Sequence, residues 1–167
     1  MRDWSNRLTM RCRELSVDAL RRRLAGPGVI LEVPPNSYQI TAKSGDLAEE
    51  LLEMYGDFAL LETGAIPDFQ IDLRRFPTWR PSGWKLLQIL IDGSSEFDPS
   101  QRSHAYPLLE SAMNWCDAYR TTHRLLLHAG VVERHGLAVI LPGASGSGKS
   151  TLSTALAARG WRLLSDE

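Results

Sequence analysis

The stretch that decides the fold lies near the end of the chain and reads Gly143-Ala144-Ser145-Gly146-Ser147-Gly148-Lys149-Ser150-Thr151. It contains the spacing Gly-x4-Gly-Lys-Ser/Thr, which is typical of a phosphate-binding loop between a buried strand and a helix. The apolar run at residues 137–141 predicts that strand, and residues 151–159 predict the helix. The pattern therefore predicts a nucleotide-binding core of the P-loop kind.

Each residue type in this stretch suits a phosphate ligand. The glycines let the backbone turn tightly, so that successive N–H groups point at phosphate oxygens, and the helix adds its positive end. Lys149 can reach the β- and γ-phosphates, and the Ser150 hydroxyl can ligate Mg²⁺. All nine residues are therefore assigned to binding the phosphates of a nucleotide. The alternative, a Gly/Ser-rich linker that matches by chance, is disfavoured by the flanking strand and helix.

Composition narrows the class of protein. The chain has 167 residues, 43% of them hydrophobic, which allows one large or two small domains with a real core. A net charge of −1 favours neither nucleic acid nor an anionic membrane as the main partner. No apolar run approaches the roughly 20 residues that span a bilayer, and the N-terminus lacks a signal sequence. Cys12 and Cys116 are interpreted as reduced thiols, and the protein is expected to be cytoplasmic.

Residues 1–98 are predicted to form a small α+β module. Ser16 is a candidate helix N-cap for residues 17–24, and Gly56 is expected to end a second helix. Alternating or apolar runs predict strands at 29–33, 38–42, 68–74 and 85–91. The three arginines at 21–23 are interpreted as a solvated helix face, with binding of a phosphate or acidic partner as the alternative.

After a polar linker at 99–104, residues 105–167 are predicted to begin the P-loop domain. The expected order is a helix at 105–119, a long strand at 124–133, a tight turn, and the strand that precedes the loop. The fold class is thus α/β, an incomplete P-loop core preceded by the α+β module. Residues 124–167 are too few for a complete nucleotide-binding sheet, so we expect a truncated domain that alone binds ATP weakly and turns over little.

Two positions beside the loop are candidates for chemistry. His128 lies in the predicted hairpin, where a hydrogen-bonded core histidine is the ordinary interpretation and a catalytic role the alternative. Asp166 and Glu167 follow a short strand, predicted to be buried, at 161–165. Because ligands bind outside the carboxyl ends of strands in open α/β sheets, we expect these acids near the phosphates, for Mg²⁺ coordination or proton abstraction. The alternative is a solvated acidic terminus.

These residues resemble a known family. The segment Leu127-His128-Ala129-Gly130, the phosphate loop and the segment Arg159-Gly160-Trp161-Arg162-Leu163-Leu164-Ser165-Asp166-Glu167 resemble the catalytic core of HPr serine kinase/phosphorylase. They resemble more closely the HPr-kinase-related kinases of the "kinase A" type, and Asn114-Trp115-Cys116 shares in the likeness.

The resemblance implies ATP-dependent phosphorylation of a serine hydroxyl on a protein, HPr-like or another. It implies that Asp166 acts as the base on that hydroxyl and that His128 lies close to Asp166. Glu167 is assigned to Mg²⁺ together with Ser150, and the family also suggests a homo-oligomer. Two alternatives stay open: another P-loop kinase that acts on a small molecule, and a non-catalytic module that senses nucleotide and binds a partner.

Overall fold

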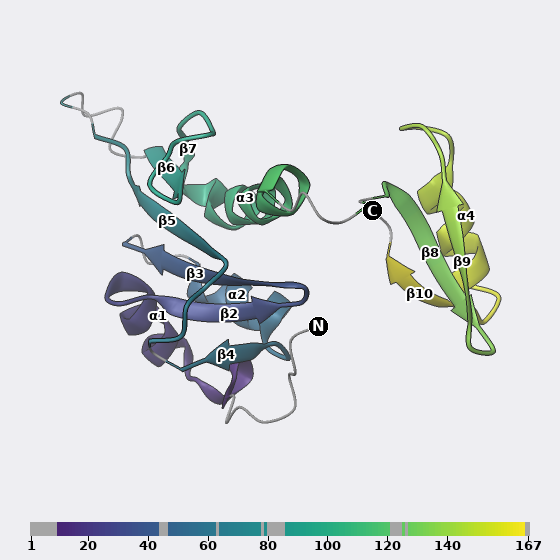
Figure 1. Cartoon of the computed structure of the whole chain (residues 1–167), viewed down its shortest axis with the longest axis horizontal. Coiled ribbons are helices and arrows are strands. Elements are labelled where there is room, and N and C mark those ends of the chain that lie inside the picture. Colours follow the sequence, from purple (N-terminus) through teal and green to yellow (C-terminus); the bar gives the residue numbers. More distant parts are fainter. Residues whose placement is uncertain are drawn as a thin grey trace. The chain divides into compact units, whose positions relative to one another are not determined.

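The computed structural model describes residues 10–43, 47–62, 64–77, 79, 86–120, 125 and 127–165. The chain divides into two compact units, residues 1–121 and 122–167. Each unit has its own sheet, of seven strands in the first and three in the second (Figure 1). The predicted mixture of helices and strands is confirmed. Among the described residues, no helix is long and apolar enough to cross a lipid bilayer.

The first unit is built on a mixed sheet with the strand order β1-β4-β2-β3-β5-β6-β7. Its neighbours are antiparallel except β3 and β5, which run parallel. The elements in chain order are β1 (Met10–Arg11), α1 (Val17–Ala25), β2 (Val29–Val33), β3 (Asn36–Ala42), α2 (Ala48–Tyr55), β4 (Ala59–Leu61), β5 (Phe69–Arg75), β6 (Leu86–Ile91), β7 (Ser100–Gln101) and α3 (Ala105–Arg120).

One face of this sheet forms the core. Tyr38 of β3 lies opposite Leu31 on one side and Phe69 on the other, and all three are buried. Residues opposite each other on paired strands share a face, so these side chains form one apolar row. The three helices supply the other half of the same cluster, through residues such as Leu20 of α1, Leu51 of α2 and Leu109 of α3.

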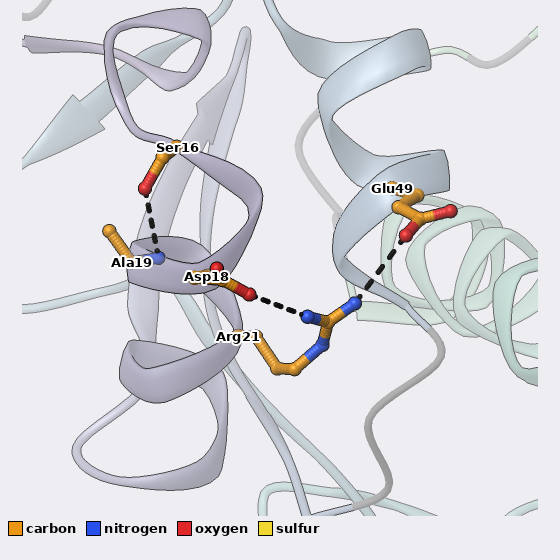
Figure 2. Close-up of polar contacts among 5 residues, drawn as sticks. All are labelled: Ser16, Asp18, Ala19, Arg21 and Glu49. Carbon is orange, nitrogen blue, oxygen red and sulfur yellow. Dashed lines mark hydrogen bonds and ion pairs between the residues drawn. The ribbon is translucent and has the colours of Figure 1, made fainter.

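α1 begins and is held in place as its sequence predicts. The Ser16 side chain accepts a hydrogen bond from the Ala19 N–H at 3.2 Å, which caps the helix (Figure 2). Arg21 then contacts Asp18 at 2.8 Å and Glu49 of α2 at 3.5 Å, so its guanidinium links the two helices. Arg21, the first of the three arginines, therefore forms exposed ion pairs within the first unit, which agrees with a solvated helix face.

Two carboxylates of α3 connect this helix to the rest of the first unit. Glu110 accepts hydrogen bonds from the hydroxyls of Tyr106 and Tyr55, the latter at 2.6 Å. Asp117 accepts from the Tyr38 hydroxyl at 2.8 Å and from the Asn36 amide. Burial, followed by these carboxylates, raises the pKa of the three tyrosines. The tyrosines therefore remain neutral donors over the whole physiological range.

The position of α3 differs from the predicted domain boundary. The sequence suggested a boundary between residues 98 and 105 and grouped the helix with the P-loop. The helix packs instead on β5, β6 and β7, and its apolar side chains complete the first core. The units divide after residue 121, because the apolar stripe of α3 is buried by the first sheet.

The second unit contains β8 (Ala129–Arg134), β9 (Leu137–Pro142), α4 (Lys149–Ala157) and β10 (Arg162–Ser165). Its strand order is β10-β8-β9, with antiparallel neighbours. The predicted hairpin is confirmed, and its turn uses the positive φ angles of His135 (55°) and Gly136 (79°). The strand predicted at 161–165 is confirmed as β10, but its predicted burial is wrong. β10 is an edge strand with exposed leucines. Among the described residues of the second unit, α4 packs against it.

Candidate functional site

Residues 143–148 form a loop that joins the carboxyl end of β9 to the first residue of α4, in the predicted order. Gly148 is the N-cap of α4 and has a φ of 90°. Gly146 has a φ of 76°. Both values lie in the left-handed region, which glycine adopts freely and residues with a Cβ adopt at a cost. The backbone conformation itself therefore requires two of the glycines in the motif.

The first glycine of the motif is required by a close approach within the loop. A Cβ at Gly143 would lie 2.6 Å from the Ser147 hydroxyl oxygen. The Ser147 N–H donates to the Ala144 carbonyl at 3.1 Å, which closes a tight turn. The loop thus folds back on its own beginning, and a side chain at Gly143 would have to displace the Ser147 hydroxyl.

Lys149 places a positive charge against this loop. Its ammonium group donates to the carbonyl oxygens of Gly143 at 2.9 Å and Ala144 at 3.1 Å. The charge lies beside the first turn of α4, where unpaired N–H groups and the positive end of the helix dipole also lie. An anionic group at the loop would therefore meet two favourable electrostatic contributions, the ammonium charge and the partial positive charge of the helix N-terminus.

An open cavity of about 400 Å³ lies at the loop, within the range of roughly 300–1,000 Å³ found for small-molecule sites. Its lining consists of His128, Ser145, Gly146, Gly148, Lys149, Ser150 and Thr151. The cavity thus brings together His128 and six of the nine predicted loop residues. His128 is exposed, so the interpretation as a core histidine is wrong. Gly143, Ala144 and Ser147 shape the loop behind this lining.

Strand register explains why His128 meets the loop. Ala129, the first residue of β8, lies opposite Pro142, the last residue of β9. On the other side of β8, Val131 lies opposite Ser165, the last residue of β10. The start of β8 and the carboxyl ends of β9 and β10 therefore share one end of the sheet. His128 and the loop flank that end directly.

The predicted acids lie beyond the described part of the chain. Asp166 and Glu167 follow Ser165 and are outside the described residues. Ser150, the other predicted Mg²⁺ ligand, lines the cavity. Within the described ranges, no group of three or more His, Cys, Asp or Glu side chains is arranged to hold a metal ion.

Gly130 and Ser153 form a close contact between β8 and α4, the helix that follows the loop. A Cβ at Gly130 of β8 would lie 2.4 Å from the Ser153 hydroxyl oxygen on α4. Ser153 is buried, and its hydroxyl has no hydrogen-bond partner among the described residues. Apolar residues of a helix usually mark its packed side, but Leu152 of α4 is 48% exposed. The serine was missed because hydrophobic periodicity gives no weight to a small polar residue at a close helix–strand contact.

The two cysteines belong to the first unit. Cys12 and Cys116 are both buried in the first core, and neither forms a disulfide, as the sequence predicted. Burial raises the pKa of the Cys12 thiol to about 11. A neutral buried thiol is a poor nucleophile, so Cys12 is a packing residue.

Comparison with known proteins finds no matching family model, no matching curated protein and no matching solved structure. The resemblance to HPr-kinase-related kinases therefore rests on the residues quoted above.

Proposed function

We propose that this chain carries the nucleotide site of an ATP-dependent protein-serine kinase of the HPr-kinase-related type. The observation that carries the proposal is the cavity that His128 shares with the loop before α4. A phosphate cradle beside a histidine suits transfer of a phosphoryl group to a hydroxyl better than nucleotide storage alone.

The residues at the loop fit ATP and Mg²⁺. The cradle has glycines where side chains would fill it or strain it, a lysine ammonium, and the N-terminus of a nine-residue helix. The N–H groups of residues 145–151 and Lys149 would hold the phosphates, and Ser150 and Glu167 would hold the metal ion. Bound MgATP supplies the γ-phosphoryl group and a cation that neutralises part of its charge.

The remaining roles follow from the resemblance. Asp166 would accept the proton of the acceptor serine hydroxyl, and His128 would lie beside it at the same end of the sheet. The acceptor is proposed to be a protein, HPr-like or another. These roles require the two groups and the loop to converge, which agrees with the shared end of β8, β9 and β10.

Removal of the Lys149 ammonium tests the nucleotide site. We predict that Lys149→Ala weakens MgATP binding by about 10- to 100-fold, since a hydrogen bond to a charged group contributes about 1.5–3 kcal/mol. Isothermal titration measures the affinity. Lys43→Ala is the matched control, because it removes the same charge from an exposed position in the first unit. Equal affinities of the wild type and Lys149→Ala would contradict the site.

A transfer assay separates the proposed kinase from the alternatives. Radiolabelled ATP is offered with purified HPr protein and, separately, with free L-serine. Slow formation of phosphoserine on the protein, which is lost in Asp166→Asn, is the expected result, because little turnover is expected of this chain alone. Labelled free serine alone would favour a small-molecule kinase, and binding of ATP without transfer would favour a nucleotide-sensing module.

A further inference from the structure

Another cavity, of about 350 Å³, lies within the first unit. This volume is within the range of roughly 300–1,000 Å³ found for small-molecule sites. One row of its lining residues crosses strands β4, β2, β3 and β5, and consists of Leu61, Ile30, Gln39 and Gln70. Residues opposite each other share a face, so two apolar side chains and two amides lie together on the sheet. The core row around Tyr38 is one residue away along the strands and lies on the other face.

Among the described lining residues, Arg23 in the last turn of α1 carries the only formal charge. The Gly28 N–H donates to the Arg23 carbonyl at 2.8 Å, which holds the end of the helix beside the start of β2. Arg21 of the same helix has acidic partners (Figure 2), whereas Arg23 has no ion pair among the described residues. The Arg23 guanidinium can therefore pair with an anionic ligand, and no described lining residue would repel that ligand.

The loop between β4 and β5 adds an exposed apolar side chain to the cavity. Ile66 of this loop lines the cavity and is 88% exposed, more than any other large hydrophobic residue in the described part of the chain. Covering such a side chain with the apolar part of a ligand is favourable, because apolar surface is removed from water. The cavity thus combines one cation with apolar surface and two amides, which suits a carboxylate that has an apolar body.

We propose that this cavity binds a small carboxylate with an apolar body, whose carboxylate pairs with Arg23 and whose apolar part contacts Ile30, Leu61 and Ile66. A guanidinium holds a carboxylate through two parallel N–H···O bonds, so the pair also orients the ligand. A phosphate dianion is less suitable. The cavity lies at the C-terminus of α1, whose dipole disfavours a second negative charge. The site lies within the first unit, so the proposal does not depend on nucleotide binding.

Nuclear magnetic resonance of the full chain can test this site directly. Two probes are titrated, 4-methylpentanoate and 3-phenylpropanoate, and each is compared with its neutral amide. The side-chain amide signals of Gln39 and Gln70 report binding within the cavity. Arg23→Gln removes the proposed charge. Arg22→Gln is the matched control, because Arg22 is an exposed arginine of the same helical turn that is not among the lining residues.

We expect saturable shifts of both glutamine signals by at least one carboxylate, with an apparent Kd on the order of 1 mM. Its neutral amide should bind about tenfold more weakly. Arg23→Gln should raise the Kd about tenfold or more, and Arg22→Gln should leave it nearly unchanged. The proposal is overturned if neither carboxylate shifts these signals, or if the amides bind as tightly as the carboxylates. Equal losses in the two variants would also overturn it, because they would indicate a general attraction of anions to the end of α1.

Discussion

Gly130 controls how closely α4 approaches β8. The Ser153 hydroxyl occupies the space that a side chain at this position would need, at 2.4 Å from the ideal Cβ. The next nearest atom of Ser153, its own Cβ, would lie at 3.7 Å, which is an ordinary contact. The conflict is therefore confined to one oxygen atom. Since that oxygen is buried without a partner among the described residues, its removal costs the folded state little.

This geometry predicts a rescue between two alanine substitutions. Gly130→Ala should lower the free energy of unfolding of the second unit by about 1–3 kcal/mol, the usual cost of overpacking. Ser153→Ala should be nearly neutral, and the double variant should recover most of the loss. Urea unfolding followed by hydrogen exchange of β8 measures all three. Additive effects of the two substitutions would contradict the proposed contact.

Cys12 makes stability depend on pH. Burial raises the pKa of its thiol from 9.0 to about 11, so the folded state keeps its proton after the unfolded chain has released it. Stability from this group is therefore complete below pH 9.0 and declines as the pH rises towards 11. The expected slope between pH 9 and 10 is about 1 kcal/mol per pH unit, since the unfolded thiol is only half ionised at pH 9.0 and approaches full ionisation above it. Urea unfolding of the first unit between pH 9 and 10 should show this slope in the wild type and a flatter one in Cys12→Ala. The difference between the two proteins isolates the thiol, because tyrosines of the unfolded chain, whose ordinary pKa is 10.0, ionise alike in both.

Among the elements, α3 is held by polar groups as well as by its apolar stripe. Asp117→Ala would leave the Tyr38 hydroxyl without the partner that accepts its hydrogen bond. We predict that the free energy of unfolding of the first unit falls by about 1–3 kcal/mol, the cost of a buried unpaired polar group. Asp98→Ala, at an exposed position of the same unit, is the control. Urea titration should show recovery of part of the loss in the double variant Tyr38→Phe/Asp117→Ala, and no recovery would argue against this pair.

Element prediction succeeded where local chemistry was sufficient. Ser16 indicated the start of α1, and strict alternation indicated β5. The short strands β1, β4 and β7 were missed, because two or three residues carry no period. β10 was placed correctly but predicted to be buried, since apolar content indicates what a strand can bury rather than what covers it.

At the scale of the whole molecule, some parts of the candidate site depend on local sequence and others on contacts between distant residues. Loop 143–148 was predictable because its motif is local and contains its own glycines and lysine. The position of His128 beside the loop depends on the register of β8 and β9. The sequence predicts the hairpin that joins these strands but not their register. The membership of α3 could not be read from its sequence. Its apolar stripe could pack against either sheet. Tyr38 and Tyr55, which donate hydrogen bonds to its carboxylates, lie far away along the chain.

The place of α3 has a consequence for synthesis on the ribosome, where domains form from the N-terminus onward. The last helix of the first unit completes its core, because Leu109 and Ala112 belong to the same core as Leu31 and Tyr38. A nascent chain that has emerged only to residue 98 would still expose the apolar side of β5 and β6. The first unit can therefore close only when α3 has left the exit tunnel, immediately before the second unit begins to appear.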